Sequence, residues 1–450
     1  MLSDQSRYIK AVERIYDKYL TSGRVQELRQ EGVSLAAFYN DRTNLCRILA
    51  KSVSDGHYAL TPGRLKRVKI EDKERTLFSF CLTDLIIHAV VAQILTELAE
   101  PYYSKCLFSY RKKFSTRAAL DVLAEYMRAH LKNHPEPKNR GVYVLKRDIR
   151  SYTDSIPVHA RSRVWTLLVA LFGCYGVPDI TQDPLFELVR EVIRPTVFDF
   201  SGGIFTLYCG VPTGSPISVF LFNFYLADFD AELEKIKNTL YLRYSDDFIL
   251  VSENKTELLL ASQVIVEKLQ ALELSVKEEK NLNYFFNGAG KHPDNFPGGK
   301  GTQVIHFLGW SLRFNGSIGL GEKKCQRLRH DLRERIFKTN RILSAYDLET
   351  RGRLICRTIN EVFRPSNIFS QAYAGLLLKA VNDRSQLKEI DLWIVRMVMR
   401  VLIGDSSVRA FRKIPYRKIR QKWGLISLVH NRNRLVPLTD DRKTVEVTQL

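Results

Sequence analysis

The stretch YLRYSDDFILVS, residues 241–252, constrains the fold of this chain more than any other. Two apolar runs of strand composition flank the adjacent acids Asp246 and Asp247. Asp is a poor strand former but is favoured in turns, where its side chain bonds the nearby backbone. The stretch therefore predicts a β-hairpin with two carboxylates at its tip. A plain turn explains the pair when it stands alone, and a metal-binding role requires a third carboxylate.

A third carboxylate follows a second predicted strand. In GVYVLKRDIRSYTDSIP, residues 141–157, the run from Val142 to Leu145 has the composition of a buried strand, and Asp148 lies at its end. On neighbouring strands, Asp148, Asp246 and Asp247 would meet at one edge of a sheet. Uncompensated, such a cluster costs several kcal/mol, and divalent cations remove the repulsion. Oxygen ligands suit Mg²⁺, and two ions about 4 Å apart can catalyse phosphoryl transfer.

The charge of the chain predicts a polyanionic partner. The formal net charge is +20, and residues 321–450 hold 28 Lys and Arg against 13 Asp and Glu. A helical segment of one sign is expected to lie on a phosphate backbone. No stretch approaches 18 consecutive apolar residues and the N-terminus lacks the apolar core of a signal peptide, so we expect nucleic acid and no membrane. Seven dispersed cysteines without a Cys-x-x-Cys pair fit a cytoplasmic protein.

Six motifs follow one another in an order that resembles bacterial reverse transcriptases related to group II intron and retron enzymes. Each motif alone is a weak pattern, and their shared order makes them specific. In chain order they are the fingers-like segment 58–120, RDIRSYTDSI (147–156), CGVPTGSPISVFLFNFYL (209–226), the hairpin YSDD, LELSVKEEKNLNYF (272–285) and the primer-grip-like HFLGW (306–310).

This resemblance implies an α+β right-hand polymerase fold, with fingers, a palm built on an antiparallel sheet, and a helical thumb. We expect an N-terminal helical extension over residues 1–57 and interleaved fingers and palm over 58–314. A basic helical thumb with a C-terminal extension is expected over 315–450.

The resemblance also implies the roles of individual residues. Asp148, Asp246 and Asp247 would be catalytic and, with the carbonyl of Ile149, would hold two Mg²⁺ ions, Mn²⁺ being the alternative; Asp247 would be less directly bound. Lys280 would lie near the leaving pyrophosphate and could donate a proton. The incoming nucleotide would contact Lys69, Arg75, Tyr152, Thr153, Pro212, Thr213 and Gly214, and the primer grip would be Leu308 and Gly309.

For several of these residues a purely structural or surface role remains an open alternative. Lys69 could belong to a solvated basic hairpin. Lys66, Arg67 and Lys73 are close enough in sequence to be confused with the true triphosphate ligands. Lys280 could be a surface lysine. Gly210, Pro212 and Gly214 fit a turn, called here the Gly-x-Pro turn. Ser218 and Asn223 could fix this turn or simply pack in the helix that follows it.

Two positions depart from the pattern of the family. Thr213 stands where relatives have Gln, and a shorter side chain contacts less of the template–nucleotide pair. Thr153 is the fifth residue after Asp148, where relatives place an aromatic ring that rejects ribonucleotides. Either Tyr152, one residue earlier, takes over this gate through a local backbone shift, or discrimination against ribonucleotides is relaxed.

The function expected from these motifs is RNA-directed DNA synthesis that extends a primer with dNTPs. The partners would be an RNA template, expected to be a non-coding RNA, and the DNA product. The sequence is also compatible with a homo-oligomer or with a partner protein. No Cys/His-bearing nuclease segment is recognisable, so we expect a stand-alone enzyme in bacterial defence against phage, with a retron-type role second.

Two rival functions remain open at this point. One is a polymerase that makes repetitive or untemplated DNA. The other is an RNA-binding, maturase-like splicing cofactor that synthesises nothing. A pure nuclease explains the motifs least well.

Overall fold

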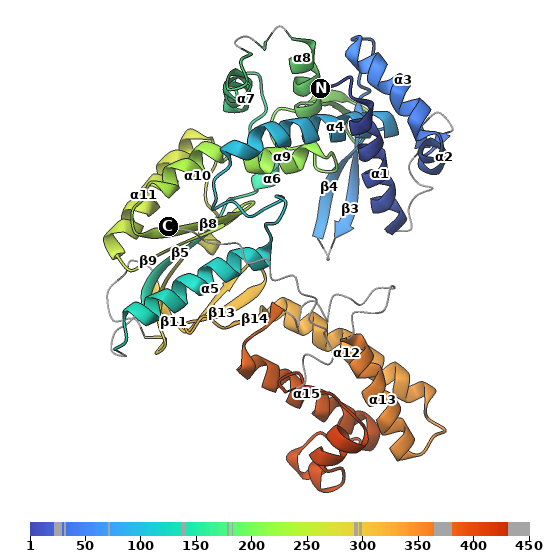
Figure 1. Ribbon diagram of the computed structural model, residues 1–450, viewed down its shortest axis with the longest axis vertical. Coiled ribbons are helices and arrows are strands. Elements are labelled where there is room, and N and C mark those ends of the chain that lie inside the picture. The colour runs from blue at the N-terminus through green and yellow to red at the C-terminus, as the bar shows by residue number, and fades with distance from the viewer. Residues whose placement is uncertain are drawn as a thin grey trace. The chain divides into compact units, whose positions relative to one another are not determined.

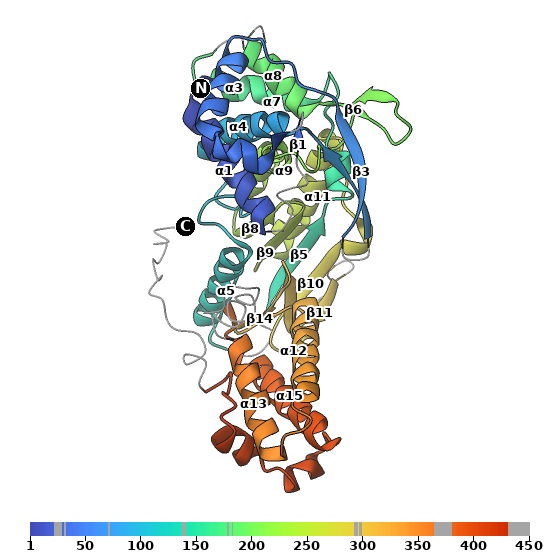
Figure 2. The same ribbon diagram turned by 90° about the vertical axis from the view of Figure 1, so that its right-hand side faces the viewer.

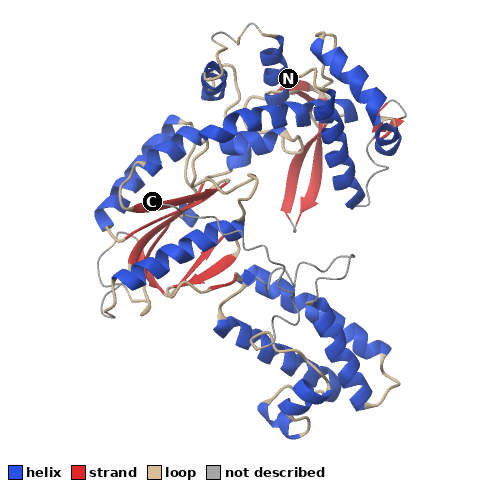
Figure 3. Cartoon of the chain, in the orientation of Figure 1, coloured by secondary structure: helices blue, strands red, loops and turns tan. Residues whose placement is uncertain are grey.

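The computed structural model describes residues 1–21, 29–30, 33–70, 73–136, 141–177, 180–181, 183–291, 296, 299–363 and 380–430. The chain divides into two compact units. Unit 1 comprises Met1–Ser115, Val142–Tyr284 and Phe296–Gly299, and unit 2 comprises Thr116–Gly141, Phe285–Asn295 and Lys300–Leu450. Figure 3 shows that both units mix helices with strands, and the predicted α+β class is confirmed.

Unit 1 contains most of the strands. Its N-terminal part runs through α1 (Gln5–Thr21), β1 (Arg29–Gln30), β2 (Val33–Ser34), α2 (Leu35–Asn40), α3 (Arg42–Ser54), β3 (Gly63–Ile70), β4 (Lys73–Ser79), α4 (Leu82–Ala99) and η1 (Glu100–Tyr102). The rest comprises β5 (Val142–Asp148), α6 (Tyr152–Ser155), α7 (Arg163–Gly173), α8 (Pro184–Ile193), β6 (Thr196–Phe198), β7 (Ile204–Thr206), α9 (Ile217–Phe224), α10 (Ala227–Glu234), β8 (Thr239–Tyr244), β9 (Asp247–Ser252), α11 (Lys255–Ala271), η2 (Glu278–Lys280) and β10 (Leu282–Phe286).

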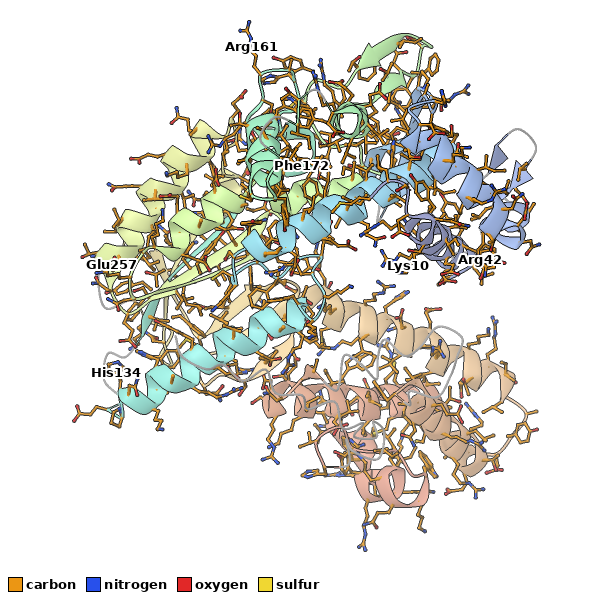
Figure 4. The ribbon with its side chains drawn as sticks, turned by 45° about the horizontal axis from the view of Figure 1, so that its top comes forward. Lys10, Arg42, His134, Arg161, Phe172 and Glu257 are labelled. Carbon is orange, nitrogen blue, oxygen red and sulfur yellow. The ribbon has the colours of Figure 1, made fainter. Side chains whose placement is uncertain are left out.

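The main sheet of unit 1 carries the strand order β10-β5-β9-β8. β5 pairs antiparallel with β9, and β9 pairs antiparallel with β8. β5 is buried along almost its whole length because it is central and covered, and its residues from Val142 to Leu145 are apolar. Helix α11 packs against β5 and β9, and α10 packs against β8 (Figure 1). Figure 4 shows Arg161, before α7, extending outward, whereas Phe172 of α7 is 4% exposed.

Helix α4 is the apolar centre of the rest of unit 1. With η1 it forms a segment, Leu82–Tyr102, that is long and apolar enough to cross a membrane by length and composition, and 72% of its apolar 18-residue window is buried. It packs against α1, α8 and α9. An all-round apolar helix is what a core position requires, so packing accounts for the composition of α4.

A second sheet of unit 1 has the order β4-β3-β6-β7. β3 and β4 form a long antiparallel hairpin, and β6 joins the free edge of β3 in parallel, with Arg64 opposite Phe198. β7 then pairs antiparallel with β6 and forms the outer edge.

Unit 2 combines a small sheet with helices. Its elements are α5 (Thr116–Asn133), β11 (Gly299–Thr302), β12 (Val304–Phe307), β13 (Trp310–Arg313), β14 (Ile318–Leu320), α12 (Glu322–Ile342), α13 (Leu348–Val362), α15 (Arg384–Ile403), η3 (Val408–Arg412) and η4 (Lys418–Lys422). β12, β13 and β14 form an antiparallel meander. Asp347 and Asp383 begin α13 and α15 as N-caps, each accepting two backbone N–H groups of the first turn.

Part of the basic run at residues 411–423 has a structural role. Lys418 pairs with Glu349 at 2.5 Å, and Arg420 lies 3.3 Å from Asp391. Trp423 lies so close to α13 that a Cβ at Gly352 would come within 2.5 Å of its ring. These cations therefore hold the end of the described chain against α13 and α15 and contribute less to a nucleic-acid surface than their number suggests.

Candidate active site

The end of β5 and the β8–β9 hairpin bring the three predicted metal ligands together. Asp148, the last residue of β5, is the ladder partner of Asp247, the first residue of β9. Directly opposed residues of antiparallel strands lie about 4.5–5.5 Å apart at Cα and project from the same face. Asp246 lies in the two-residue turn between Tyr244 and Asp247. Its carbonyl accepts the N–H of Ile149 at 3.2 Å.

These residues fit a hard divalent cation. Asp148 is 5% exposed, and Asp246 and Asp247 are half-buried. Carboxylates that face one another with so little water repel each other and lose solvation. A divalent cation between them would offset both costs, and oxygen ligands suit Mg²⁺ or Mn²⁺. Ile149, whose N–H is bonded to Asp246, has its backbone beside this carboxylate group.

The turn that carries Asp246 is tied to α9. Ser245 has a φ of +56°, a left-handed conformation that an isolated serine adopts rarely. Its N–H donates to the Ser109 hydroxyl at 3.0 Å. Ser109 and Asn223 bond each other twice, through Ser109 Oγ to Asn223 Oδ1 at 2.6 Å and Asn223 Nδ2 to the Ser109 carbonyl at 2.7 Å. Both side-chain bonds of Asn223 therefore support, through Ser109, the turn that carries Asp246, and Asn223 also packs in its helix.

A buried ion pair lies beneath the same turn. Arg243 and Asp230 are fully buried, and Arg243 donates to both Asp230 carboxylate oxygens at 2.6 Å. The Tyr241 hydroxyl also donates to Asp230 at 2.7 Å. Arg243 further bonds the carbonyls of Ser245 at 3.0 Å and Asn223 at 3.1 Å. Sequence reasoning missed this pair, although an arginine inside the apolar strand YLRY was a usable signal, because a buried cation needs a partner.

The Gly-x-Pro-like loop is held from both sides. Val211 donates its N–H to the Thr153 carbonyl at 2.8 Å, and the Thr213 carbonyl accepts the N–H of Phe78 in β4 at 2.7 Å. The Ser218 hydroxyl donates to the Pro212 carbonyl at 2.8 Å, so Ser218 fixes the turn. The loop is thus clamped between β4 and the segment after Asp148.

Gly214→Ala is expected to destabilise unit 1. Gly214 has a φ of +116°, and an added Cβ would collide with the carbonyl oxygen of Phe78. A forbidden backbone conformation costs about 1–3 kcal/mol, and here the collision adds to it. Urea denaturation measures the loss. Gly173→Ala, in α7 with no positive φ and open space around it, should be neutral or stabilising. Equal effects of the two substitutions would contradict this account.

His88 of α4 supports the same loop and is expected to make stability depend on pH. Its Nδ1 lies 2.9 Å from the Ser215 hydroxyl. Complete burial lowers the pKa of His88 to about 4, with Asp84 opposing the shift. Between pH 6.5 and 4 the unfolded chain therefore binds a proton that the folded chain does not bind. As the pH is lowered through this range, the free energy of unfolding decreases by up to about 3 kcal/mol.

The pH effect is checked by the free energy of unfolding at several pH values. His88→Asn is expected to be less stable at pH 7 and to have a shallower slope between pH 6.5 and 4. Carboxylates remote from His88 contribute equally to both slopes, so the difference between the slopes reports on His88. Identical slopes would contradict the assignment.

Tyr152 is committed to the interior. It is 3% exposed, its hydroxyl donates to the Phe222 carbonyl at 2.9 Å, and burial raises the pKa of its phenol. Thr153 is half-buried, with its carbonyl bonded to Val211. The backbone of this segment thus shows no shift that turns the Tyr152 ring outward in place of Thr153.

The two predicted triphosphate contacts lie on opposite faces of the β3–β4 hairpin. Lys69 pairs with Glu74, and Arg75 pairs with Val68 in the next rung of the ladder. Side chains of successive rungs alternate, so Arg75 shares its face with Lys66 and not with Lys69. Both Lys69 and Arg75 are exposed. The side chain of the third predicted cation, Lys280, lies outside the described part of the structure, and its backbone belongs to η2.

In unit 2, Leu308 and Gly309 form the turn between β12 and β13. Phe307 and Trp310 pair across the hairpin, and Leu308 and Gly309 have φ of +51° and +74°, as a two-residue primed turn requires. Lys324 Nζ lies 3.9 Å from the centroid of the Trp310 ring and 3.5 Å from the Leu308 carbonyl. Burial lowers the pKa of Lys324 to about 8.

A family model describes the centre of the chain. The model named Reverse transcriptase (RNA-dependent DNA polymerase) matches residues 69–312, which include Asp148, Asp246 and Asp247. No protein of curated function matches the sequence at a significant level.

Solved telomerase structures resemble the chain weakly. The apo telomerase of Candida tropicalis truncated from its C-terminal domain has a TM-score of 0.44 at 15% identity, with 63% of this chain and 60% of that chain covered. The telomerase of Candida albicans in complex with a TWJ fragment of telomeric RNA has the same score and identity, with 83% and 67% covered. The chain therefore spans less than two thirds of the first of them.

Proposed function

The chain belongs to the reverse transcriptase (RNA-dependent DNA polymerase) family, and from this premise we propose that it extends a primer on an RNA template by a two-metal mechanism. Family membership makes it an RNA-directed DNA polymerase, a nucleotidyltransferase, with the right-hand fold. The observation that carries the mechanism is the ladder pairing of Asp148 with Asp247 beside Asp246.

In the proposed reaction the protein positions the metal ions and the triphosphate of the incoming nucleotide. Asp148 and Asp246 would hold two Mg²⁺ ions, with the carbonyl of Ile149 and, less directly, Asp247. Bound there, the ions would lower the pKa of the primer 3′-hydroxyl and neutralise the triphosphate. Arg75 offers the triphosphate a planar fork matched to phosphate oxygens.

The biological setting is also a proposal. We place the enzyme in the bacterial cytoplasm, in defence against phage, with a non-coding RNA as template. The six ordered motifs and the basic residues 321–450 support an enzyme that works on RNA. A second candidate, synthesis of repetitive or untemplated DNA, is favoured by Thr213, whose hydroxyl bonds the Val211 carbonyl of its own loop at 3.4 Å.

The test is synthesis by protein purified with its bound nucleic acid. Mg²⁺ and each labelled dNTP or rNTP are added, beside an Asp246→Asn/Asp247→Asn control, and the product is sequenced. DNA complementary to co-purified RNA supports the proposal, and DNA without a matching RNA supports untemplated synthesis. RNA binding without any product from the unmodified protein would contradict both.

Thr153→Tyr is expected to improve rejection of ribonucleotides. With Tyr152 buried and bonded to Phe222, no aromatic ring occupies the position at which relatives exclude the 2′-hydroxyl. A ring at residue 153 should raise the dNTP over rNTP ratio of kcat/KM by roughly 10- to 100-fold, the discrimination available from one excluded group. Tyr152→Phe loses only a buried hydroxyl and should leave the ratio unchanged. A change in the ratio from Tyr152→Phe alone would assign the gate to Tyr152 instead.

A further inference from the structure

An exposed aromatic hairpin extends the β3–β4 sheet. All three residues of its edge strand β7 are exposed. Ile204 is 61% exposed, Phe205 39%, and Phe200, in the turn between β6 and β7, 52%. Figure 2 shows this hairpin projecting beyond β3. Because successive strand residues alternate, Ile204 and Phe205 present apolar surface on both faces that packing within unit 1 leaves uncovered in part.

Each face of the hairpin combines a ring with an arginine. Arg64 Cζ lies 5.7 Å from the centroid of the Phe198 ring, and Arg67 Cζ lies 4.6 Å from that of Phe200. The two arginines alternate along β3, and both are exposed. An arginine that stacks on an aromatic ring keeps its N–H edge available for phosphate oxygens.

The strand beside the hairpin is basic. β3 carries Arg64, Lys66, Arg67 and Lys69 and no acidic residue. The one carboxylate of the hairpin, Asp199, folds the turn itself, because it accepts the N–H groups of Ser201 and Gly203 at 2.8 Å. Exposed rings beside fixed cations are the combination that binds single-stranded nucleic acid, since unpaired bases stack and phosphates pair with the cations. Binding of an apolar protein partner would not explain the cations of β3.

We propose that the β6–β7 hairpin, residues 196–206, together with Arg64 and Arg67, binds single-stranded RNA. Bases stack on Phe200 and Phe205, and the two arginines hold the backbone. RNA is preferred to DNA because the family copies RNA, and in this one respect the inference rests on the proposed function. The surface shares no residue with the carboxylate group of Asp148, Asp246 and Asp247.

The test compares Phe200→Ala/Phe205→Ala with the unmodified protein, using fluorescence anisotropy of a short unstructured RNA. Losing two stacking platforms should raise Kd by about 10- to 100-fold. The dependence of log Kd on log salt should stay the same, because no phosphate contact is removed. Binding of a double-stranded RNA of equal length should not change. The control is Leu260→Ala/Val266→Ala on α11, whose side chains are 48% and 54% exposed, and it should bind as the unmodified protein does.

A second variant tests the cations separately. Arg64→Gln/Arg67→Gln should weaken RNA binding and reduce the salt slope by about 1.4, about 0.7 for each phosphate contact on a single strand. The aromatic and arginine variants together distinguish stacking from charge. Both replace exposed side chains, and unchanged melting temperatures would show that they fold.

Several outcomes would overturn the proposal. An unchanged Kd for single-stranded RNA in the aromatic variant is one, and an equal loss on double-stranded RNA is another. A dimer that becomes a monomer in this variant, with RNA binding intact, would make the hairpin an interface between copies. Primer extension on a pre-annealed duplex separates the two hypotheses. RNA binding through the hairpin without synthesis sinks only the proposed function, and synthesis with a hairpin irrelevant to RNA sinks only this inference.

Discussion

Replacing Asp246 with Asn should lower the rate of nucleotide addition by about 1000-fold or more. The neutral amide of Asn lacks the negative charge with which a carboxylate binds a divalent cation. The fold should survive. Asp246 is half-buried in a turn held by its backbone, and its carbonyl bond to Ile149 is independent of the side chain. Removing one of three neighbouring negative charges should even leave the metal-free protein equally or slightly more stable.

Single-turnover primer extension measures this loss, and thermal unfolding with and without Mg²⁺ shows its cause. The unmodified protein should be stabilised by Mg²⁺, and Asp246→Asn should lose most of that stabilisation. Asp228→Asn is a matched control, since Asp228 is an exposed acid of α10 paired with Arg163. Activity of Asp246→Asn within tenfold of the unmodified protein would remove Asp246 from the metal site.

Arg243→Met is expected to lower the free energy of unfolding by about 3–5 kcal/mol, because it leaves Asp230 charged and buried without a cation. The side chains of this pair are 0% and 1% exposed. Arg163→Met is a matched control, because Arg163 and Asp228 are also 2.6 Å apart but are 51% and 52% exposed. Screening by water should limit the cost of this control to about 1 kcal/mol.

A double substitution separates the pair's stability from its role in the site. Arg243→Met/Asp230→Leu removes both charges and should recover much of the stability lost in Arg243→Met. Its activity should stay low, since the bonds from Arg243 to the carbonyls of Ser245 and Asn223 are still missing. Full activity in a stable double variant would show that Arg243 serves the fold alone. Urea denaturation and primer extension on the same preparations decide this.

The parts of the site that could be predicted from the sequence are those with a local signature. Asp246 and Asp247 lie between two apolar runs, and Asp148 ends a third, so strand composition alone placed them at strand ends. The loop at Gly210–Gly214 was predictable for a similar reason, because Gly214 takes a conformation that only glycine tolerates. The fold class and the enzyme class are confirmed, whereas the domain boundaries and the roles of individual residues stay predictions.

What could not be predicted depends on register and on partners distant in the chain. Lys69 and Arg75 are close in sequence, yet their faces depend on which residues pair across the hairpin, and a shift of one residue reverses them. Arg243 and Asp230 each look like ordinary charged residues until the fold buries them together. The exposed apolar surface of β7 could not be predicted from the sequence either, because the exposure of Ile204 and Phe205 depends on the position of β7 at the edge of the folded sheet.

The bond between Ser245 and Ser109 joins positions that are 136 residues apart. Contacts of such separation close large loops, and the entropy cost of loop closure must be met before the contact stabilises the fold. During synthesis, the turn that presents Asp246 therefore has no fixed shape until the chain has emerged beyond β9 and folded back on the segment before α5. An incomplete chain would carry the acids without the frame that aims them, and so would be inert until unit 1 is almost whole.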